Sequence, residues 1–290
     1  MLRYAWILLR PARTQDRQRE HSQHVLTVAH LCLLFACGGG ETVSPDARRS
    51  CAETADPHDE DGDGFFDACD NCPAIENNQA DTTEIAMRAF ADGVGDACDP
   101  RPGGSGDDLH AFYSFASDAQ ASAWTGSGFS IEGDALHAAG QASLTSARPA
   151  PGDGGLYVLA QISSITFGGA GALSITLDGD GIGAGATCTL DALGVTATEV
   201  GGASSSESFV TAIEPMQPIT FVAWRTVVLT PTGRAAEVRC RATRGGVTKE
   251  ARVMLTDDLV SGTYMISVGD ASSAIASLSV YTSPGPKNPS

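Results

Sequence analysis

The segment Arg234-Ala-Ala-Glu-Val-Arg-Cys-Arg-Ala-Thr243 alternates apolar and charged side chains over most of its length. In an extended chain Val238, Cys240 and Ala242 fall on one face, and the charged residues fall on the other. This period of two is typical of a strand with one face buried against a core. Turn sequences at 231–233 and 244–246 bound the segment, so we expect it to be the middle strand of two consecutive hairpins.

Similar short segments follow one another throughout residues 108–282, where charges are few. The partners of the two hairpins are predicted at 219–229 and 247–255. Further strands are predicted at 129–132, 135–137, 155–167, 171–177, 184–191, 194–200, 206–213, 261–268 and 273–282. Many short strands at this spacing favour a mainly β fold, a two-sheet jelly-roll-type sandwich over 108–282. Residues 101–107 are interpreted as a linker before the sandwich, and residues 283–290 as a tail.

The first 50 residues are interpreted as a targeting region. Basic residues precede an apolar run at 25–36 that is too short to span a bilayer. The run ends Leu34-Phe-Ala-Cys37-Gly, which resembles the bacterial lipobox, where a signal peptidase cuts before a cysteine that then receives lipid. The resemblance implies a signal peptide over 1–36, lipidation of Cys37 and a flexible tether over 37–50. The protein would be exported and held by its lipid in the cell envelope, at the outer membrane or cell surface; an ordinary signal peptide is the alternative.

The cysteines support export. Of eight cysteines, Cys32 leaves with the signal peptide and Cys37 takes lipid. The remaining six are Cys51, Cys69, Cys72, Cys98, Cys188 and Cys240. An even number suits three disulfides in an oxidising compartment. Cys188 and Cys240 lie in predicted strands and are expected to pair, adding roughly 4–5 kcal/mol of stability on the chain-entropy model.

The negative charge is concentrated in one region. The chain has a formal net charge of −17, and residues 51–110 hold 16 acidic residues against two arginines. Such a field repels phosphate backbones and attracts divalent cations. Nucleic-acid binding is therefore excluded.

Residues 59–70 have the spacing of a calcium loop. Carboxylates occupy positions one, three, five, nine and twelve of this twelve-residue stretch, with glycine at position six. The predicted ligands are Asp59, Asp61, Asp63, the carbonyl of Phe65, Asp67 and Asp70. Glu60 is expected to point away from the ion. A solvated acidic linker is the alternative interpretation.

The surrounding sequence resembles the thrombospondin type 3 repeat. The resemblance rests on Asp70-Asn-Cys-Pro73, on Asn77-Asn-Gln-Ala-Asp81 and on Asp-Ala-Cys-Asp, which ends at Asp70 and again at Asp99. It implies that residues 51–100 form a small irregular module stabilised by calcium and disulfides in place of an apolar core. The family pattern further implies the pairs Cys51–Cys69 and Cys72–Cys98.

The second half of the repeat departs from the family pattern. Ten residues separate Asp81 from Asp92, and counting back from Gly93 would put Arg88 and Phe90 at ligand positions. The insert predicts a short helix over 82–91, with Asp81 and Glu84 as a capping box. Asp81 is either this cap or a ligand. The predicted second site consists of Asp92, Asp96 and Asp99.

The segments Phe112-Tyr-Ser-Phe115 and 275–281 are similar to strands of concanavalin A-like and laminin-G-like sandwiches. That fold hosts lectins, adhesion modules and hydrolases, so it does not choose a function. No paired carboxylates mark a strand interior, and the chain is therefore not expected to be an enzyme. Trp124, Trp224 and Tyr157 would either stack on sugars or fill the core.

The resulting hypothesis is a calcium-binding, surface-anchored lipoprotein with an adhesion or interaction role. Its expected partners are calcium ions, the membrane through the lipid, and a glycan or a surface protein. A glycan-binding module is the alternative, and a glycan hydrolase is the third interpretation.

Overall fold

The structure, a computed structural model of the chain, describes residues 57–87, 90–150, 154–177, 185–231, 233–255 and 262–285. The predicted signal peptide, Cys37, the tether and Cys51 lie outside these residues. All described residues belong to the unit Pro45–Ser290. Among them, no helix has both the length and the apolar character needed to cross a membrane.

Strands dominate the described chain after residue 107. They are β1 (Asp108–Tyr113), β2 (Trp124–Ile131), β3 (Leu136–Ser146), β4 (Gly155–Leu177), β5 (Ala186–Asp191), β6 (Gly194–Glu199), β7 (Ser204–Ser208), β8 (Ile219–Thr230), β9 (Gly233–Arg244), β10 (Val247–Met254) and β11 (Tyr264–Ser283). The helical elements are the single turn α2 (Thr83–Ala86) and the 3-10 segment η1 (Asp118–Ala123).

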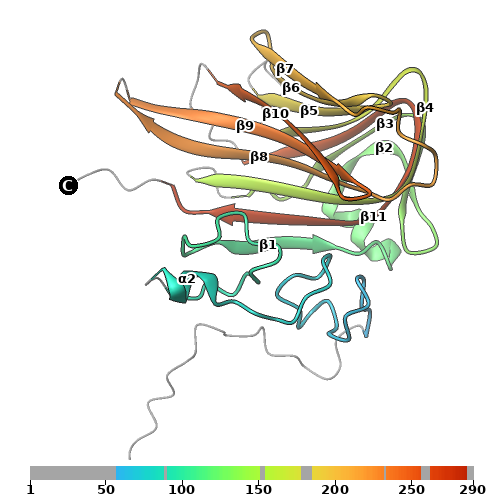
Figure 1. The fold of residues 1–290 in the computed structure, drawn as a ribbon. Coiled ribbons are helices and arrows are strands. Elements are labelled where there is room, and N and C mark those ends of the chain that lie inside the picture. The colour runs from blue at the N-terminus through green and yellow to red at the C-terminus, as the bar shows by residue number, and fades with distance from the viewer. Residues whose placement is uncertain are drawn as a thin grey trace, which may run out of the picture. The chain divides into compact units, whose positions relative to one another are not determined.

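Two long antiparallel strands, β4 and β11, are shared by the two sheets of the sandwich (Figure 1). The N-terminal half of β4 and the C-terminal half of β11 lie in the first sheet, in the order β10-β9-β8-β4-β11-β1. Their other halves lie in the second sheet, in the order β7-β6-β5-β4-β11-β3-β2. The predicted two-sheet, mainly β fold is confirmed.

The shared strands differ from the prediction. The predicted strands 155–167 and 171–177 are one continuous strand, β4, and two other predicted strands merge into β11 in the same way. A β-bulge at Asp270 separates the two halves of β11. Asp270 has a φ of +47°, and the register of the β4–β11 pairing shifts between Gly269 and Ala271. A Cβ on Gly171 would lie 2.0 Å from the Asp270 carbonyl oxygen. The glycines that suggest a break therefore let the paired strands bend from one sheet to the other.

Side chains from both sheets meet in one core. In β9 burial alternates as predicted, and Val238, Cys240 and Ala242 are fully buried. A disulfide joins Cys188 of β5 to Cys240 of β9, with Cα atoms 5.2 Å apart. This confirms the predicted pair and ties the second sheet to the first.

Residues 57–107 form an irregular module, here called the acidic module, which packs on the first sheet. Its residues Cys72, Val94 and Cys98 share a buried cluster with Leu109 of β1 and Tyr281 of β11. The apolar groups of the module are thus too few for a core of their own and bury themselves against the sandwich.

A second contact lies beside the first. Ala74 clusters with Leu159 of β4 and Val222 of β8, which are 2% and 3% exposed. The Ala74 carbonyl oxygen also accepts a hydrogen bond of 3.1 Å from Nε2 of Gln161. The acidic module therefore helps to cover the side chains of Leu159 and Val222, together with Tyr157 and Trp224 of the sheet.

We expect Ala74→Asp to detach the acidic module from the first sheet. The new carboxylate would be buried without a partner, which costs at least about 3 kcal/mol. Asn78→Asp, which adds the same charge at an exposed position, is the control. Denaturant unfolding followed by tryptophan fluorescence measures the stability of both variants. We expect the first unfolding transition, that of the acidic module, to occur at lower denaturant concentration for Ala74→Asp and not for Asn78→Asp. Equal stability of the two variants would contradict the described contact.

Candidate functional site

The loop 59–70 is closed by hydrogen bonds from its backbone to its own carboxylates. Asp59 accepts from the N–H of Gly62 at 2.8 Å on one oxygen and from the N–H of Gly64 at 3.0 Å on the other. The two glycines have φ angles of +77° and +93°, which other residues rarely adopt. The backbone therefore curls around the Asp59 carboxylate, as a cation-binding loop requires.

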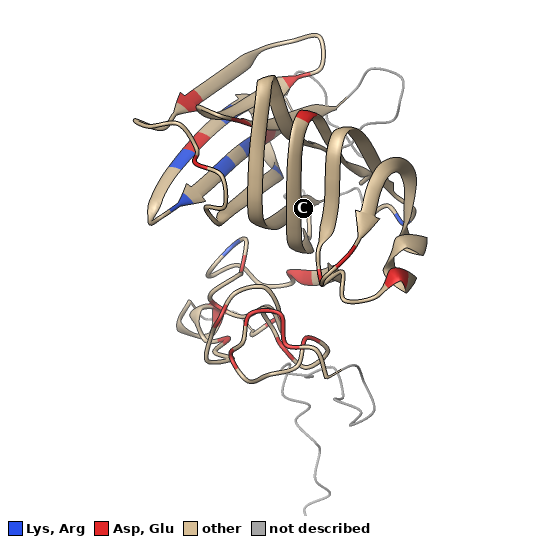
Figure 2. Ribbon diagram, turned by 90° about the vertical axis from the view of Figure 1, so that its right-hand side faces the viewer, with Lys and Arg blue, Asp and Glu red and all other residues tan. Residues whose placement is uncertain are grey.

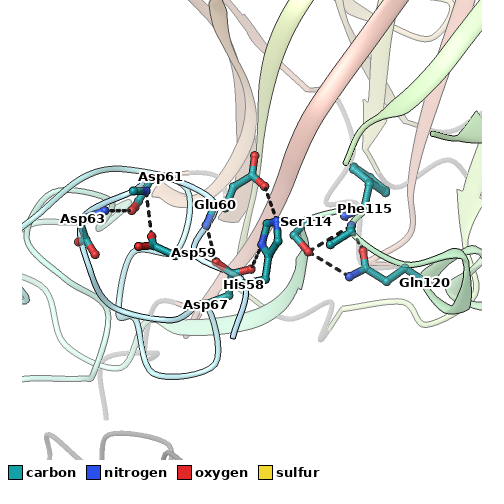
Figure 3. A network of polar contacts seen from close by, with 11 residues as sticks. His58, Asp59, Glu60, Asp61, Asp63, Asp67, Ser114, Phe115 and Gln120 are labelled. Atoms are coloured by element: carbon teal, nitrogen blue, oxygen red, sulfur yellow. Dashed lines mark hydrogen bonds and ion pairs between the residues drawn. The ribbon is translucent and has the colours of Figure 1, made fainter. Parts of the chain in front are cut away.

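Asp59, Asp61 and Asp63 are gathered by this curl. One carboxylate oxygen of each lies within 4.8 Å of the others, and Figure 3 shows the three side chains near one another. One oxygen of Asp61 is buried and has no hydrogen-bond partner among the described residues. Burial raises the pKa of Asp61 to about 6. Three carboxylates at this separation repel one another unless a positive charge lies between them.

One predicted ligand of the loop, Asp67, is placed differently. Asp67 accepts from the backbone N–H of Glu60 at 2.9 Å and lies 2.8 Å from Nδ1 of His58. It does not belong to the gathered group. Phe65 is partly exposed, and its N–H donates to Asp63. Glu60 extends away from the gathered carboxylates toward His58 (Figure 3), as expected.

Asp70 is buried at the end of the loop. Its Oδ1 accepts from the N–H of Cys72 and from Nε2 of Gln79, both at 2.7 Å. Asp63 accepts from the N–H of Asn77 at 3.2 Å. The following segment therefore positions the fifth and twelfth residues of the loop. The sequence does not predict these hydrogen bonds from Asn77 and Gln79, because side-chain amides so far from the loop form no recognisable ligand pattern.

A second group of carboxylates gathers near the insert. Asp81, Glu84 and Asp96 have oxygens within 4.8 Å of one another. Of the three residues predicted for the second site, only Asp96 belongs to this group. Asp92 instead accepts backbone N–H groups on both of its oxygens. Asp99 is buried, with its side chain next to that of Glu84.

The helix of the insert is shorter than predicted and is capped from a distance. It is reduced to α2, and the predicted capping box between Asp81 and Glu84 does not form. The Asp96 carboxylate instead accepts from the N–H groups of Thr82 and Thr83, each at 3.0 Å. Because this cap comes from far along the chain, no local pattern identifies it. Asp81 accepts from the N–H of Gly93 at 2.8 Å and is not a cap.

The electrostatics of the acidic module favour a counter-charge. Figure 2 shows Asp and Glu concentrated on its loops, whereas most Lys and Arg lie on strands of the sandwich. Burial, together with neighbouring carboxyls, raises the pKa of Asp81 to about 7 and that of Asp99 to about 9. Ionising both groups at neutral pH is therefore unfavourable unless a cation stabilises the charged form.

Disulfides hold the module together. Cys72 and Cys98 are bonded as predicted, with Cα atoms 5.5 Å apart. The bond lies close to both Asp70 and Asp99 along the chain and so links the two groups of carboxylates. Cys69 is also disulfide-bonded, and its predicted partner Cys51 lies outside the described residues.

The sandwich has a polar pocket of about 390 Å³ where β4 and β11 bend. The residues that line it include Ser130, Thr166, Ser272 and His137, and Nε2 of His137 lies 3.0 Å from the Glu132 carbonyl oxygen. No Asp or Glu is among the described residues that line it. The pocket therefore offers hydrogen-bonding groups without a carboxylate.

The aromatic residues singled out from the sequence have different roles. Trp124 is 7% exposed and packs in the core of the sandwich. Trp224 is half-buried on β8, with the guanidinium carbons of Arg239 and Arg241 at 5.5 and 4.7 Å from its ring centroid. Tyr157 packs beside Trp224, with ring centroids 5.8 Å apart.

No protein-family model and no curated protein matches this chain. Among solved structures, it is similar to the metal-free carbohydrate-recognition domain of Emp46p, with 14% identity, a TM-score of 0.39, and coverage of 58% of this chain and 93% of that one. It is also similar to the exoplasmic/lumenal domain of VIP36 in its Ca²⁺/Man3GlcNAc-bound form, with 10% identity, a TM-score of 0.44, and coverage of 61% and 91%.

A third similar structure is the β-glucanase of Bacillus licheniformis, with 10% identity, a TM-score of 0.39, and coverage of 59% of this chain and 96% of that one. All three TM-scores lie below 0.5. These likenesses therefore assign neither a family nor a function to this chain.

Gly95 is a sensitive position between the two groups of carboxylates. A Cβ there would lie 2.4 Å from Oδ1 of Asn71 and 2.7 Å from Sγ of Cys72. Because the disulfide cannot move aside, we expect Gly95→Ala to destabilise the acidic module by about 1–3 kcal/mol. Gly269→Ala is the control, since its Cβ would meet nothing closer than 3.7 Å. Thermal unfolding monitored by circular dichroism measures the difference, and matching curves would refute the predicted clash.

Proposed function

We propose that this chain is a calcium-binding surface protein in which an ion held by the loop 59–70 orders the acidic module. The observation that carries this proposal is the gathering of Asp59, Asp61 and Asp63, together with a buried Asp61 oxygen that has no hydrogen-bond partner among the described residues. Three converging carboxylates would repel one another without a cation. A bound Ca²⁺ would satisfy the Asp61 oxygen and cancel the repulsion.

The donor set favours calcium over other metals. The gathered side chains offer carboxylate oxygen alone, which suits hard cations, and no described His or Cys belongs to the group. Asp70 and the Phe65 carbonyl are the further oxygens we expect to complete the coordination. Extracellular calcium modules bind with dissociation constants on the order of 10⁻⁴–10⁻³ M. Occupancy at this level serves structure and not signalling.

The disulfides and the lipobox-like sequence support a location outside the cytoplasm. Cys72–Cys98 and Cys188–Cys240 are bonded, and such bonds persist in oxidising compartments. We propose that the protein is held in the cell envelope, at the outer membrane or cell surface, by lipid on Cys37. The sandwich would present an interaction surface there, in an adhesive role. We propose no catalytic step.

Calcium should stabilise the acidic module measurably. At a calcium concentration about 100 times the dissociation constant, binding adds about 2.7 kcal/mol. We expect EDTA to lower the midpoint of thermal unfolding and to make residues 57–107 sensitive to protease. Because that module covers part of the first sheet, Trp224 fluorescence should change as well.

Single substitutions separate the loop from general charge effects. We expect Asp63→Ala to weaken calcium binding at least tenfold in calorimetric titration. Glu60→Ala should weaken it far less, because the Glu60 side chain faces His58. The absence of any heat from added calcium in the unaltered chain would refute the proposal, as would equal effects of the two substitutions.

Glycan binding at the sandwich is the second candidate function, favoured by the polar pocket at the bend of β4 and β11. Hydroxyl and imidazole groups around a pocket of about 390 Å³ match the hydrogen-bonding groups of a sugar ring. The same lining offers no carboxylate pair for hydrolysis.

Glycan-array binding tests this second function. We expect His137→Ala and Thr166→Val to abolish binding to any glycan that the unaltered chain retains. Trp224→Ala lies outside the pocket lining and should leave that binding unchanged. If the unaltered chain binds no glycan on the array, or if only Trp224→Ala abolishes binding, the pocket is excluded as a glycan site.

A further inference from the structure

Glu84 is a buried glutamate whose carboxylate has no compensating hydrogen bond among the described residues. Its side chain is 0% exposed, and neither Oε1 nor Oε2 has a hydrogen-bond partner among the described residues. A buried polar group without a partner costs about 1–3 kcal/mol, and an ionised one costs more. The insert therefore places a strongly unfavourable group in the module unless something outside the protein compensates it.

The neighbours of Glu84 make the problem worse. Asp81 and Asp99 are 5% and 9% exposed, and each has one buried oxygen without a partner. Asp96 completes the surroundings, with an oxygen within 4.8 Å of those of Asp81 and Glu84. Asp81 and Asp99 can donate a hydrogen bond to Glu84 only while they hold a proton, because an ionised carboxylate is an acceptor alone.

No described protein group supplies the missing positive charge. The N–H groups of Thr82 and Thr83 are taken by Asp96, and the N–H of Gly93 is taken by Asp81. Among the described residues, no ion pair from Lys, Arg or His reaches any of the four carboxylates. What converges here is oxygen alone, from side chains on both sides of the insert.

The sequence register explains why Glu84 stands here. The pattern counted back from Gly93 would require ligands at Arg88 and Phe90, and Phe90 is 80% exposed. The insert instead turns the chain at α2, so that Glu84 comes within reach of Asp81 and Asp96. Asp81 and Glu84 thus supply two carboxylates in place of the two ligand positions that Arg88 and Phe90 would occupy in the repeat pattern.

We propose that Asp81, Glu84, Asp96 and Asp99 bind a second Ca²⁺, with the inserted turn supplying Glu84 as a ligand in place of the missing repeat positions. The four unpartnered oxygens of Asp81, Glu84 and Asp99 are hard donors that suit this ion. Asp92 is not among the carboxylates that gather here, and its contacts are to the backbone N–H groups of Val94 and Asp107, so we do not include it in this site. This inference rests on the proposed calcium-dependent function and extends it to a second site.

Native mass spectrometry of the purified chain at stepped calcium concentrations tests this site by counting bound ions. We expect Glu84→Gln to bind one ion fewer than the unaltered chain, because the amide offers one neutral oxygen in place of two charged ones. Glu76→Gln is the matched control, since Glu76 is an exposed glutamate of the same module. It should bind as many ions as the unaltered chain.

Three further variants make the result decisive. Asp81→Asn leaves Glu84 in place and should lose the same ion, even if Glu84→Gln folds poorly. Asp63→Ala should lose a different ion, so that a chain carrying both Asp63→Ala and Asp81→Asn loses two. Near-UV circular dichroism establishes that each variant is folded.

The outcomes distinguish this inference from the proposed function. If Asp63→Ala loses an ion while Glu84→Gln and Asp81→Asn lose none, the second site is refuted and the first stands. If the unaltered chain binds no calcium at all, both are refuted. If Glu76→Gln loses as much as Glu84→Gln, the ions are bound by net charge alone and the second site is refuted.

Discussion

The antiparallel pairing of β4 with β11 is the constraint on which the rest of the sandwich depends. Each strand continues from one sheet into the other, and the remaining strands pair with these two directly or through a neighbour. The outer face of the same pair carries Leu159 and Tyr281, against which the acidic module packs. A single pair of strands therefore fixes both sheets and the surface on which the acidic module rests.

Much of this fold follows from the sequence, because half-buried strands repeat with a period of two. The alternation in β9 predicts which of its residues are buried, and the pairing of Cys188 with Cys240 follows from their places in strands. The continuity of β4 and β11 does not follow. Glycine usually ends or interrupts a strand, and only the close approach of Gly171 to the Asp270 carbonyl explains why it is needed inside one.

The two groups of carboxylates also differ in how far the sequence predicts them. Asp59, Asp61 and Asp63 lie two residues apart, so the spacing alone predicts that they converge. Glu84 has no such spacing from Asp96, and its helix position suggests a capping role that Asp96 fills in the structure. Local patterns identify carboxylates that one turn of chain brings together, and they miss those that tertiary contacts bring together.

The Cys72–Cys98 bond has a mechanical consequence. It bridges 26 residues of sequence with a covalent link. Tension applied at the N-terminal side of the module passes through the two sulfur atoms and bypasses the segment between them. Asp81, Glu84 and Asp96 lie inside that bypassed segment, so stretching the chain would leave their mutual arrangement unstrained for as long as the bond stays oxidised.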